Sequence, residues 1–186
     1  VLMLLGIGMT MVIATGGVDL SVGAVVAISA ATATVLINPA LATELISSEE
    51  LIKDVTSTPL WICILAALTV STACGVWNGF LVSRARIQPM VATLVLMVAG
   101  RGIAQLITNG QIITVYYSPY FFIGNGYVAG LPFALFIVAV VFIIAWRLAR
   151  RTAFGLFVES VGINARSSFF SGISEKNIKL IVYTFC

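Results

Sequence analysis

The stretch IGMTMVIATGGVDLSVG, residues 7–23, places two adjacent glycines, one acid and one serine between two apolar segments. Asp19 is the first charged residue of the chain, and the next is Glu44. Ionisable residues at membrane depth are rare and mark a pathway, a pairing or a helix junction. The stretch therefore predicts a membrane-embedded helical segment that is interrupted near Gly16.

The composition indicates a membrane protein. Hydrophobic residues make up 60% of the chain and charged residues 9%, and the mean hydropathy is +1.11. A soluble domain carries about 25% charged residues, so this chain has too few to cover a soluble surface. We expect an all-α integral membrane protein, a partial polytopic helix bundle with about four to five membrane segments. Residues 1–186 would form a single transmembrane domain.

Several function classes are disfavoured by what the sequence lacks. It has no histidine, and its net charge is +3, which is too small to indicate a nucleic-acid partner. Cys63, Cys74 and Cys186 are too far apart in sequence to suggest a metal site. The phosphate-binding pattern G-x-x-x-x-G-K-[ST] of ATPases is absent. We expect a protein that is not an enzyme, with no cofactor and no metal.

Apolar runs divide the chain into segments. An α-helix rises about 1.5 Å per residue, so roughly 20 apolar residues cross a bilayer core. Such runs lie at residues 1–15, 20–38, 60–83, 89–108 and 132–146, and a last one begins near residue 178. Since the first run has no start methionine and the last stops early, we expect an internal piece of a longer membrane protein. Asn109-Gly110 predicts a turn.

Arginines orient these segments, because basic residues concentrate in cytoplasmic loops. Arg84 and Arg86 mark one such loop, and Arg147, Arg150 and Arg151 mark another. Two membrane crossings separate these loops, and an even number of crossings is what two loops on the same side of the membrane require. The acidic loop at residues 44–54 then lies outside, with an aromatic group that could form an interfacial belt or a re-entrant element: Tyr116, Tyr117, Tyr120, Phe121, Phe122 and Tyr127.

The run at 60–83 also carries residues suited to helix contacts. Close approach of helices in lipid depends on small side chains, so we expect packing along one series: Ala66, Thr69, Ser71, Ala73, Gly75 and Gly79. The amide of Asn78 in the same run is expected to hydrogen-bond a neighbouring helix rather than a substrate.

Three blocks together resemble one family. They are TGGVDLSVGA at residues 15–24, IQPMVATLVLMVAGRGIAQLITNGQ at 87–111 and FGLFVESVGINARSSFFSGI at 154–173. In this order they resemble the sugar-importing permeases of bacterial ATP-binding cassette (ABC) transporters, of the ribose/galactoside type. Within this family the chain is most similar to members that import galactofuranose, in the segments GMTMVIATGGVDLSVGAV, WNGFLV and GRGIAQLITNGQIIT.

The resemblance implies a multi-pass subunit of the bacterial inner (plasma) membrane, surrounded by lipid. Two permease subunits, identical or related, would form a pore for a monosaccharide. A periplasmic sugar-binding protein would deliver the sugar, and a separate cytoplasmic ABC ATPase subunit would hydrolyse ATP. Two alternatives remain open: a permease for a non-sugar solute, such as an amino acid or a signalling molecule, and an ATP-independent secondary transporter.

The first and second blocks supply the expected substrate path: Thr15, Gly16, Gly17, Asp19, Ser21, Gly23, Arg101 and Gln105. Two interpretations of Asp19 and Ser21 stay open, a helix N-cap for residues 20–38 or a polar lining for a sugar. Arg101 lies roughly 20 Å along the helix from Arg86. It is expected to snorkel at the outer interface, and a pair with Asp19 is a further hypothesis.

The third block supplies the expected coupling segment, residues 152–177, which would dock on the ATPase. Its candidate residues are Glu159, Gly162, Asn164, Ala165, Ser167, Ser168, Ser171 and Gly172. Ser167-Ser168 stands where the family usually has two alanines, and Phe169-Phe170 where it has a more polar pair. A Gly162→Arg variant is expected to stay in the membrane but to uncouple ATP hydrolysis from uptake.

Overall fold

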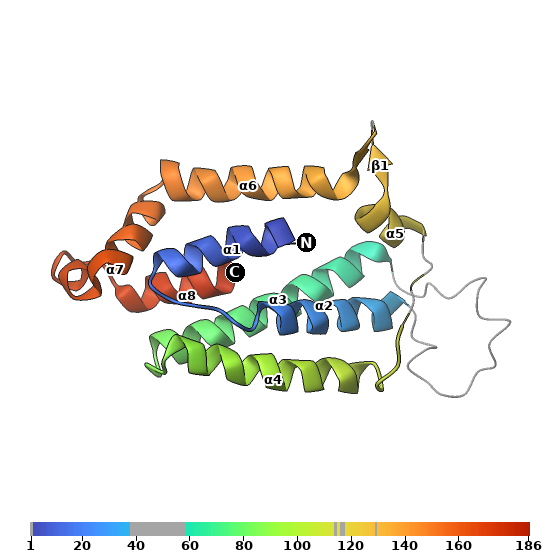
Figure 1. Cartoon of the computed structure of the whole chain (residues 1–186), viewed down its shortest axis with the longest axis horizontal. Helices are drawn as coiled ribbons and strands as arrows, with labels where there is room; N and C mark the ends of the chain where they lie inside the picture. The colour runs from blue at the N-terminus through green and yellow to red at the C-terminus, as the bar shows by residue number, and fades with distance from the viewer. Residues whose placement is uncertain (1, 38–58, 114, 116–117, 129) are drawn as a thin grey trace, which may run out of the picture.

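The computed structural model describes residues 2–37, 59–113, 115, 118–128 and 130–186. Its helices are α1 (Leu2–Ala14), α2 (Val22–Ile37), α3 (Leu60–Ser83), α4 (Pro89–Ile107), α5 (Ser118–Asn125), α6 (Phe133–Arg151), α7 (Ala153–Phe170) and α8 (Glu175–Phe185). An antiparallel hairpin of β1 (Tyr127–Val128) and β2 (Leu131–Pro132) precedes α6. Figure 1 shows the helices running side by side, which confirms the all-α fold class.

Three helices, α3, α4 and α6, are long and apolar enough to cross a membrane within the described part of the chain. The apolar helices α1 and α2 are shorter over the described residues, and the interruption predicted at the diglycine lies between them. The predicted runs 60–83 and 89–108 coincide with α3 and α4 to within one residue. The last helix begins at Glu175, a few residues before the predicted start.

The arginine loops lie at one end of the bundle, as their parity predicts. In Figure 1 the C-terminal ends of α3 and α6 are at the left, together with the first turns of α4 and α8 and with α7. Helix α5 and the hairpin lie at the opposite end, where the rings of Phe122 and Phe133 are 5.6 Å apart. The acidic loop 44–54, Tyr116 and Tyr117 lie outside the described residues.

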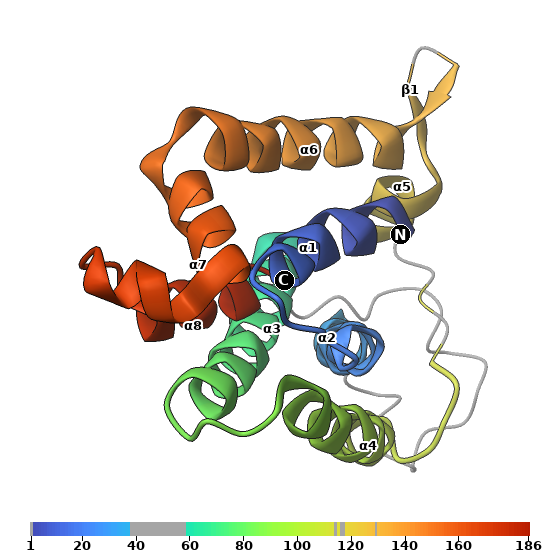
Figure 2. The same cartoon turned by 60° about the vertical axis from the view of Figure 1, so that its left-hand side comes forward.

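The interior forms where α2 packs between α3 and α4, as the view along α2 in Figure 2 shows, and where α8 packs on α3. A Cβ on Gly75 would lie 2.8 Å from the Tyr183 carbonyl oxygen, and one on Gly79 would lie 2.9 Å from that of Leu180. The predicted packing of small residues is therefore confirmed at these two positions. Thr69 and Ala73 instead line an open apolar groove on α3.

Candidate functional site

The interruption between α1 and α2 is built on the diglycine. Helix α1 ends in a turn in which the amides of Thr15 and Gly17 both donate to the Val12 carbonyl, at 3.0 and 3.2 Å. Gly16 has a φ of +75°, a left-handed conformation that glycine adopts without steric cost. Residues 17–21 are non-helical and return the chain to the start of α2. The predicted break is thus present, at the predicted residues.

Tyr183 of α8 holds the non-helical link in place. Its side chain is 1% exposed, and its hydroxyl donates to the Val18 carbonyl oxygen at 3.4 Å. A Cβ on Gly17 would collide with the same hydroxyl. The second glycine is therefore required for this close approach, whereas the first is required by its backbone conformation.

A buried polar network lies where α2 begins. The Ser21 amide and Oγ both donate to Asp19 Oδ1, at 2.8 and 2.6 Å. Asn78 Nδ2 of α3 donates to Ser21 Oγ at 2.7 Å. Asp19, Ser21 and Asn78 are all nearly inaccessible to solvent. The Asn78 amide was expected to bond a neighbouring helix, and its partner is Ser21, the non-helical residue directly before α2.

The network refines the predicted N-cap. The carbonyl of Ser21 accepts from the amides of Ala24 and Val25, so Ser21 is the residue that precedes the first turn of α2. The Asp19 carboxylate binds Ser21 rather than that first turn, and it lies near the positive end of the helix dipole, where a carboxylate is stabilised. Whether this end of α2 also lines a solute path stays a prediction.

One acceptor of the network has no partner. Asn78 Oδ1 is buried and makes no hydrogen bond among the described residues. Buried polar atoms are nearly always satisfied in native proteins. The atom is thus a hydrogen-bond acceptor available to a hydroxyl or water that enters the break.

The remaining residues of the predicted path are not part of this network. Thr15 Oγ1 donates to the carbonyl of Val12 in its own helix, and Gly23 faces open space. Arg101 and Gln105 are exposed on α4. The hypothesised Asp19–Arg101 pair does not form among the described residues: Asp19 is buried, whereas Arg101 is exposed on α4. The ion pair that the described residues do form joins Glu175 and Lys179.

The predicted coupling segment contains a short, separately capped helix. Asn164 has non-helical angles, φ −156° and ψ 96°, that divide α7 in two. Its Oδ1 accepts from the amides of Arg166 and Ser167, both at 3.1 Å, the geometry of an N-cap. At the other end Gly172 has a φ of +83°, and the Ile173 amide donates to the Ser168 carbonyl at 3.0 Å. The latter bond is the Schellman pattern of helix ends.

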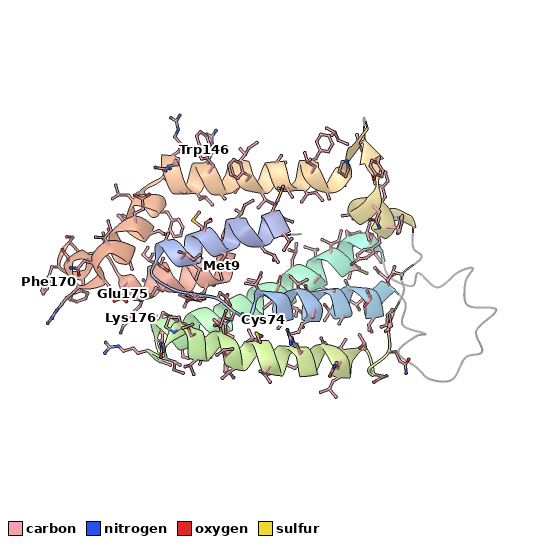
Figure 3. The ribbon with its side chains drawn as sticks, viewed as in Figure 1. Met9, Cys74, Trp146, Phe170, Glu175 and Lys176 are labelled. Atoms are coloured by element: carbon pink, nitrogen blue, oxygen red, sulfur yellow. The ribbon has the colours of Figure 1, made fainter. Side chains whose placement is uncertain are left out.

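Exposed aromatic side chains mark this short helix. Phe169 and Phe170 are 69% and 81% exposed, and their rings are 6.1 Å apart. Figure 3 shows Phe170 at the far end of the molecule, beyond the ends of α3 and α6. Glu159, Ser167 and Ser171 are also exposed, while Ser168 is buried. Exposure of this kind suits a surface that a partner covers.

Gly162 has a different place from the one expected. A Cβ there would collide with the carbonyl oxygen of Ala14, the last residue of α1. Gly162 is thus a packing contact between α7 and the diglycine break. Uncoupling of ATP hydrolysis from uptake by Gly162→Arg stays a prediction, and any side chain at this position must also displace α7 from α1.

Comparison with known proteins classifies the chain. The family described as "Branched-chain amino acid transport system / permease component" matches residues 1–186. The chain belongs to this permease family. The permease is 44% identical to the galactofuranose transporter permease protein YtfT of Escherichia coli (strain K12) over 97% of this chain and 48% of that protein.

Other relatives of the permease also carry sugar names. It is 36% identical to the fructose import permease protein FruF of Bifidobacterium longum (strain NCC 2705), over 97% of this chain and 47% of that protein. It is 31% identical to the ribose import permease protein RbsC of E. coli (strain K12), over 98% and 53%. The permease spans about half the length of these relatives. No solved structure matches it.

These comparisons confirm the resemblance to sugar ABC importer permeases and the placement in the inner membrane. They assign no role to individual residues.

Sequence reasoning missed Tyr183, since nothing in an apolar run indicates that its hydroxyl contacts a carbonyl 165 residues away.

Proposed function

We propose that the permease forms part of the translocation path of an ABC importer for a monosaccharide. It would act with a second permease subunit, identical or related, a periplasmic sugar-binding protein and a separate cytoplasmic ATPase subunit. The observation that carries this proposal is the short helix after Asn164, which is capped at both ends and lies at the arginine-rich end of the bundle.

That helix has the properties required to receive force from an ATPase. Its caps fix its direction relative to the rest of α7, since each satisfies backbone groups that would otherwise need water. Phe169 and Phe170 offer apolar area that a partner would bury. The part of α7 that precedes Asn164 touches the end of α1 through Gly162, so a displacement of α7 would be felt directly at the break.

The break offers a hydrogen-bonding group suited to a hydroxyl-bearing solute. Asp19 Oδ1 is already occupied by two hydrogen bonds from Ser21. Asn78 Oδ1 is an unused acceptor that a sugar hydroxyl would satisfy. The names of the relatives favour a sugar as well. The family description also names branched-chain amino acids, so amino acid import is the second candidate.

The test is uptake by the permease reconstituted with its ATPase and binding protein. We expect ATP-dependent uptake of one sugar from a panel that includes ribose, fructose, arabinose and galactofuranose, with branched-chain amino acids as comparison. Uptake that persists without ATP would overturn the ABC mechanism. Uptake of an amino acid in place of any sugar would establish the second candidate.

A pair of variants tests the coupling helix separately. Phe170→Ser should reduce co-purification of the ATPase and the ATP-driven uptake together. Phe121→Ser is the matched control, because Phe121 is also exposed, at 57%, but lies on α5 at the opposite end. Equal ATPase retention by both variants would contradict a coupling role for the short helix.

A further inference from the structure

A polar cavity of about 350 Å³ lies at the arginine-rich end, between the turn that joins α3 to α4 and the first turn of α8. Figure 3 shows Glu175 and Lys176 together at this end of α8, beside the start of α4. The residues of its lining that matter here are Ser83, Arg86, Gln88, Glu175, Lys176 and Lys179. None of them belongs to the break or to the short helix after Asn164, although Glu175 and Lys176 fall within the expected coupling segment, residues 152–177.

The lining is positively charged. Arg86, Lys176 and Lys179 supply three cations against the single carboxylate of Glu175, which leaves two positive charges in excess. Glu175 is bound to Lys179 at 2.6 Å. Arg86 has a φ of +54°, a conformation uncommon for a residue with a side chain. Such backbone positions recur where a structure holds a ligand.

Two helix N-termini converge on the same cavity. Helix α4 begins at Pro89 after Gln88, and α8 begins at Glu175 after Ser174. Neither residue before the first turn makes a side-chain capping bond. Both helices contribute a positive dipole end, but α4 begins with a proline that has no N–H, so the free backbone amides belong to the first turn of α8. A helix N-terminus with free amides binds phosphate groups.

An unsatisfied hydroxyl adds an independent observation. Ser83 is 4% exposed, and its Oγ makes no hydrogen bond to any residue that the structure describes. Buried hydroxyls are ordinarily bonded. An oxyanion in the cavity would accept this bond after a rotation of the serine side chain.

The cavity lies at the level of lipid head groups. Helix α3 has 24 residues, which at 1.5 Å per residue is about 36 Å, longer than the roughly 30 Å hydrocarbon core. Its last residue, Ser83, therefore reaches the interface on the arginine side. Basic pockets between helices on the cytoplasmic side bind the head groups of anionic lipids.

We propose that this cavity binds the phosphate of an anionic phospholipid from the cytoplasmic leaflet. The backbone amides at the start of α8 and Ser83 would contact phosphate oxygens, and Arg86 and Lys176 would balance the charge. Inorganic phosphate shares this chemistry, but the interfacial depth favours the lipid. A lipid held here would link the α3–α4 turn to the start of α8.

The test measures lipid retention by the permease complex in mild detergent, using native mass spectrometry with phosphatidylglycerol, phosphatidylcholine and inorganic phosphate as probes. We expect preferential retention of phosphatidylglycerol. Arg86→Gln and Lys176→Gln should each weaken it about fivefold, the effect of one basic residue near an anionic surface. Arg151→Gln is the matched control, because Arg151 lies at the same end but stacks 5.9 Å from the Trp146 ring, outside the cavity.

Glu175→Gln provides a test of opposite sign. It removes the one carboxylate of the lining, so phosphatidylglycerol should bind more tightly, a gain that misfolding would not produce. Equal retention of phosphatidylglycerol and phosphatidylcholine, or an equal loss in Arg151→Gln, would overturn the proposal. Displacement of the lipid by inorganic phosphate at matched concentration would overturn the lipid as the ligand and assign the cavity to a soluble phosphate.

Discussion

Ser21 is the residue on which the polar network depends, and its replacement by alanine is the sharpest test of the break. The serine hydroxyl accepts from Asn78 Nδ2 at 2.7 Å and donates to Asp19 Oδ1 at 2.6 Å. In Ser21→Ala both bonds are lost, while the Ser21 backbone amide still donates to Asp19. The Asn78 side chain then has no partner for either of its polar atoms.

The expected magnitude follows from those losses. A buried polar group left without a partner costs about 1–3 kcal/mol, whereas a hydrogen bond between membrane helices contributes on average about 0.6 kcal/mol. We therefore expect Ser21→Ala to lower the free energy of unfolding by about 2 kcal/mol. Ser29→Ala is the matched control on α2, because Ser29 bonds only the Val26 carbonyl of its own helix. It should change the free energy by less than about 0.5 kcal/mol.

Reversible unfolding in mixed detergent micelles measures these differences, and a double-mutant cycle isolates the pair. In an Asn78→Leu background the amide is gone, so Ser21→Ala should cost about 1 kcal/mol less than in the parent. A cost that is the same in both backgrounds would refute the reasoning. It would show that Ser21 and Asn78 do not stabilise one another.

Other contacts give predictions of the same kind. Gly79→Ala should destabilise the protein by about 1–3 kcal/mol through a backbone clash with α8. Gly102→Ala is the control and should be neutral or slightly stabilising, because a Cβ there meets nothing within 4 Å. Equal unfolding midpoints of the two variants would contradict close packing of α3 on α8. Asn164→Ala should cost the short helix about 1 kcal/mol, and faster hydrogen exchange of the two amides that it caps checks this. Gly17→Ala should displace the Tyr183 hydroxyl and release the link between α1 and α2, detectable as increased proteolysis there; unchanged cleavage would contradict the contact.

The helices that cross the membrane could be predicted from the sequence because proline and turn-forming residues lie at their ends. Pro89 opens α4 at its first turn, and the turn predicted at Asn109-Gly110 forms with φ of +51° and +70° at the two residues. Helix α8 was placed too late because its first turn is polar. Hydropathy detects the apolar part of a helix and misses a charged start such as Glu175.

The residues that form the break could be predicted from the sequence, but the residues that they contact could not. Two glycines beside a buried acid indicate an interruption by themselves. The link from Ser21 to Asn78 spans 57 residues, and no local pattern specifies such a contact. The same limit applies to Gly162, which looks like a small residue of a docking helix but contacts Ala14. Where a small residue packs is decided by the tertiary arrangement.

The Tyr183 contact has a consequence for biosynthesis. Val18 and Tyr183 are 165 residues apart, and a ribosome adding about 5–20 residues per second needs roughly 10–30 s to make the intervening chain. During that interval the segment with Asp19 has left the ribosome while its last stabilising helix has not. The nascent break must therefore remain beside the insertion machinery or near the membrane surface until α8 arrives. The break is thus completed only when a helix made 165 residues later reaches it.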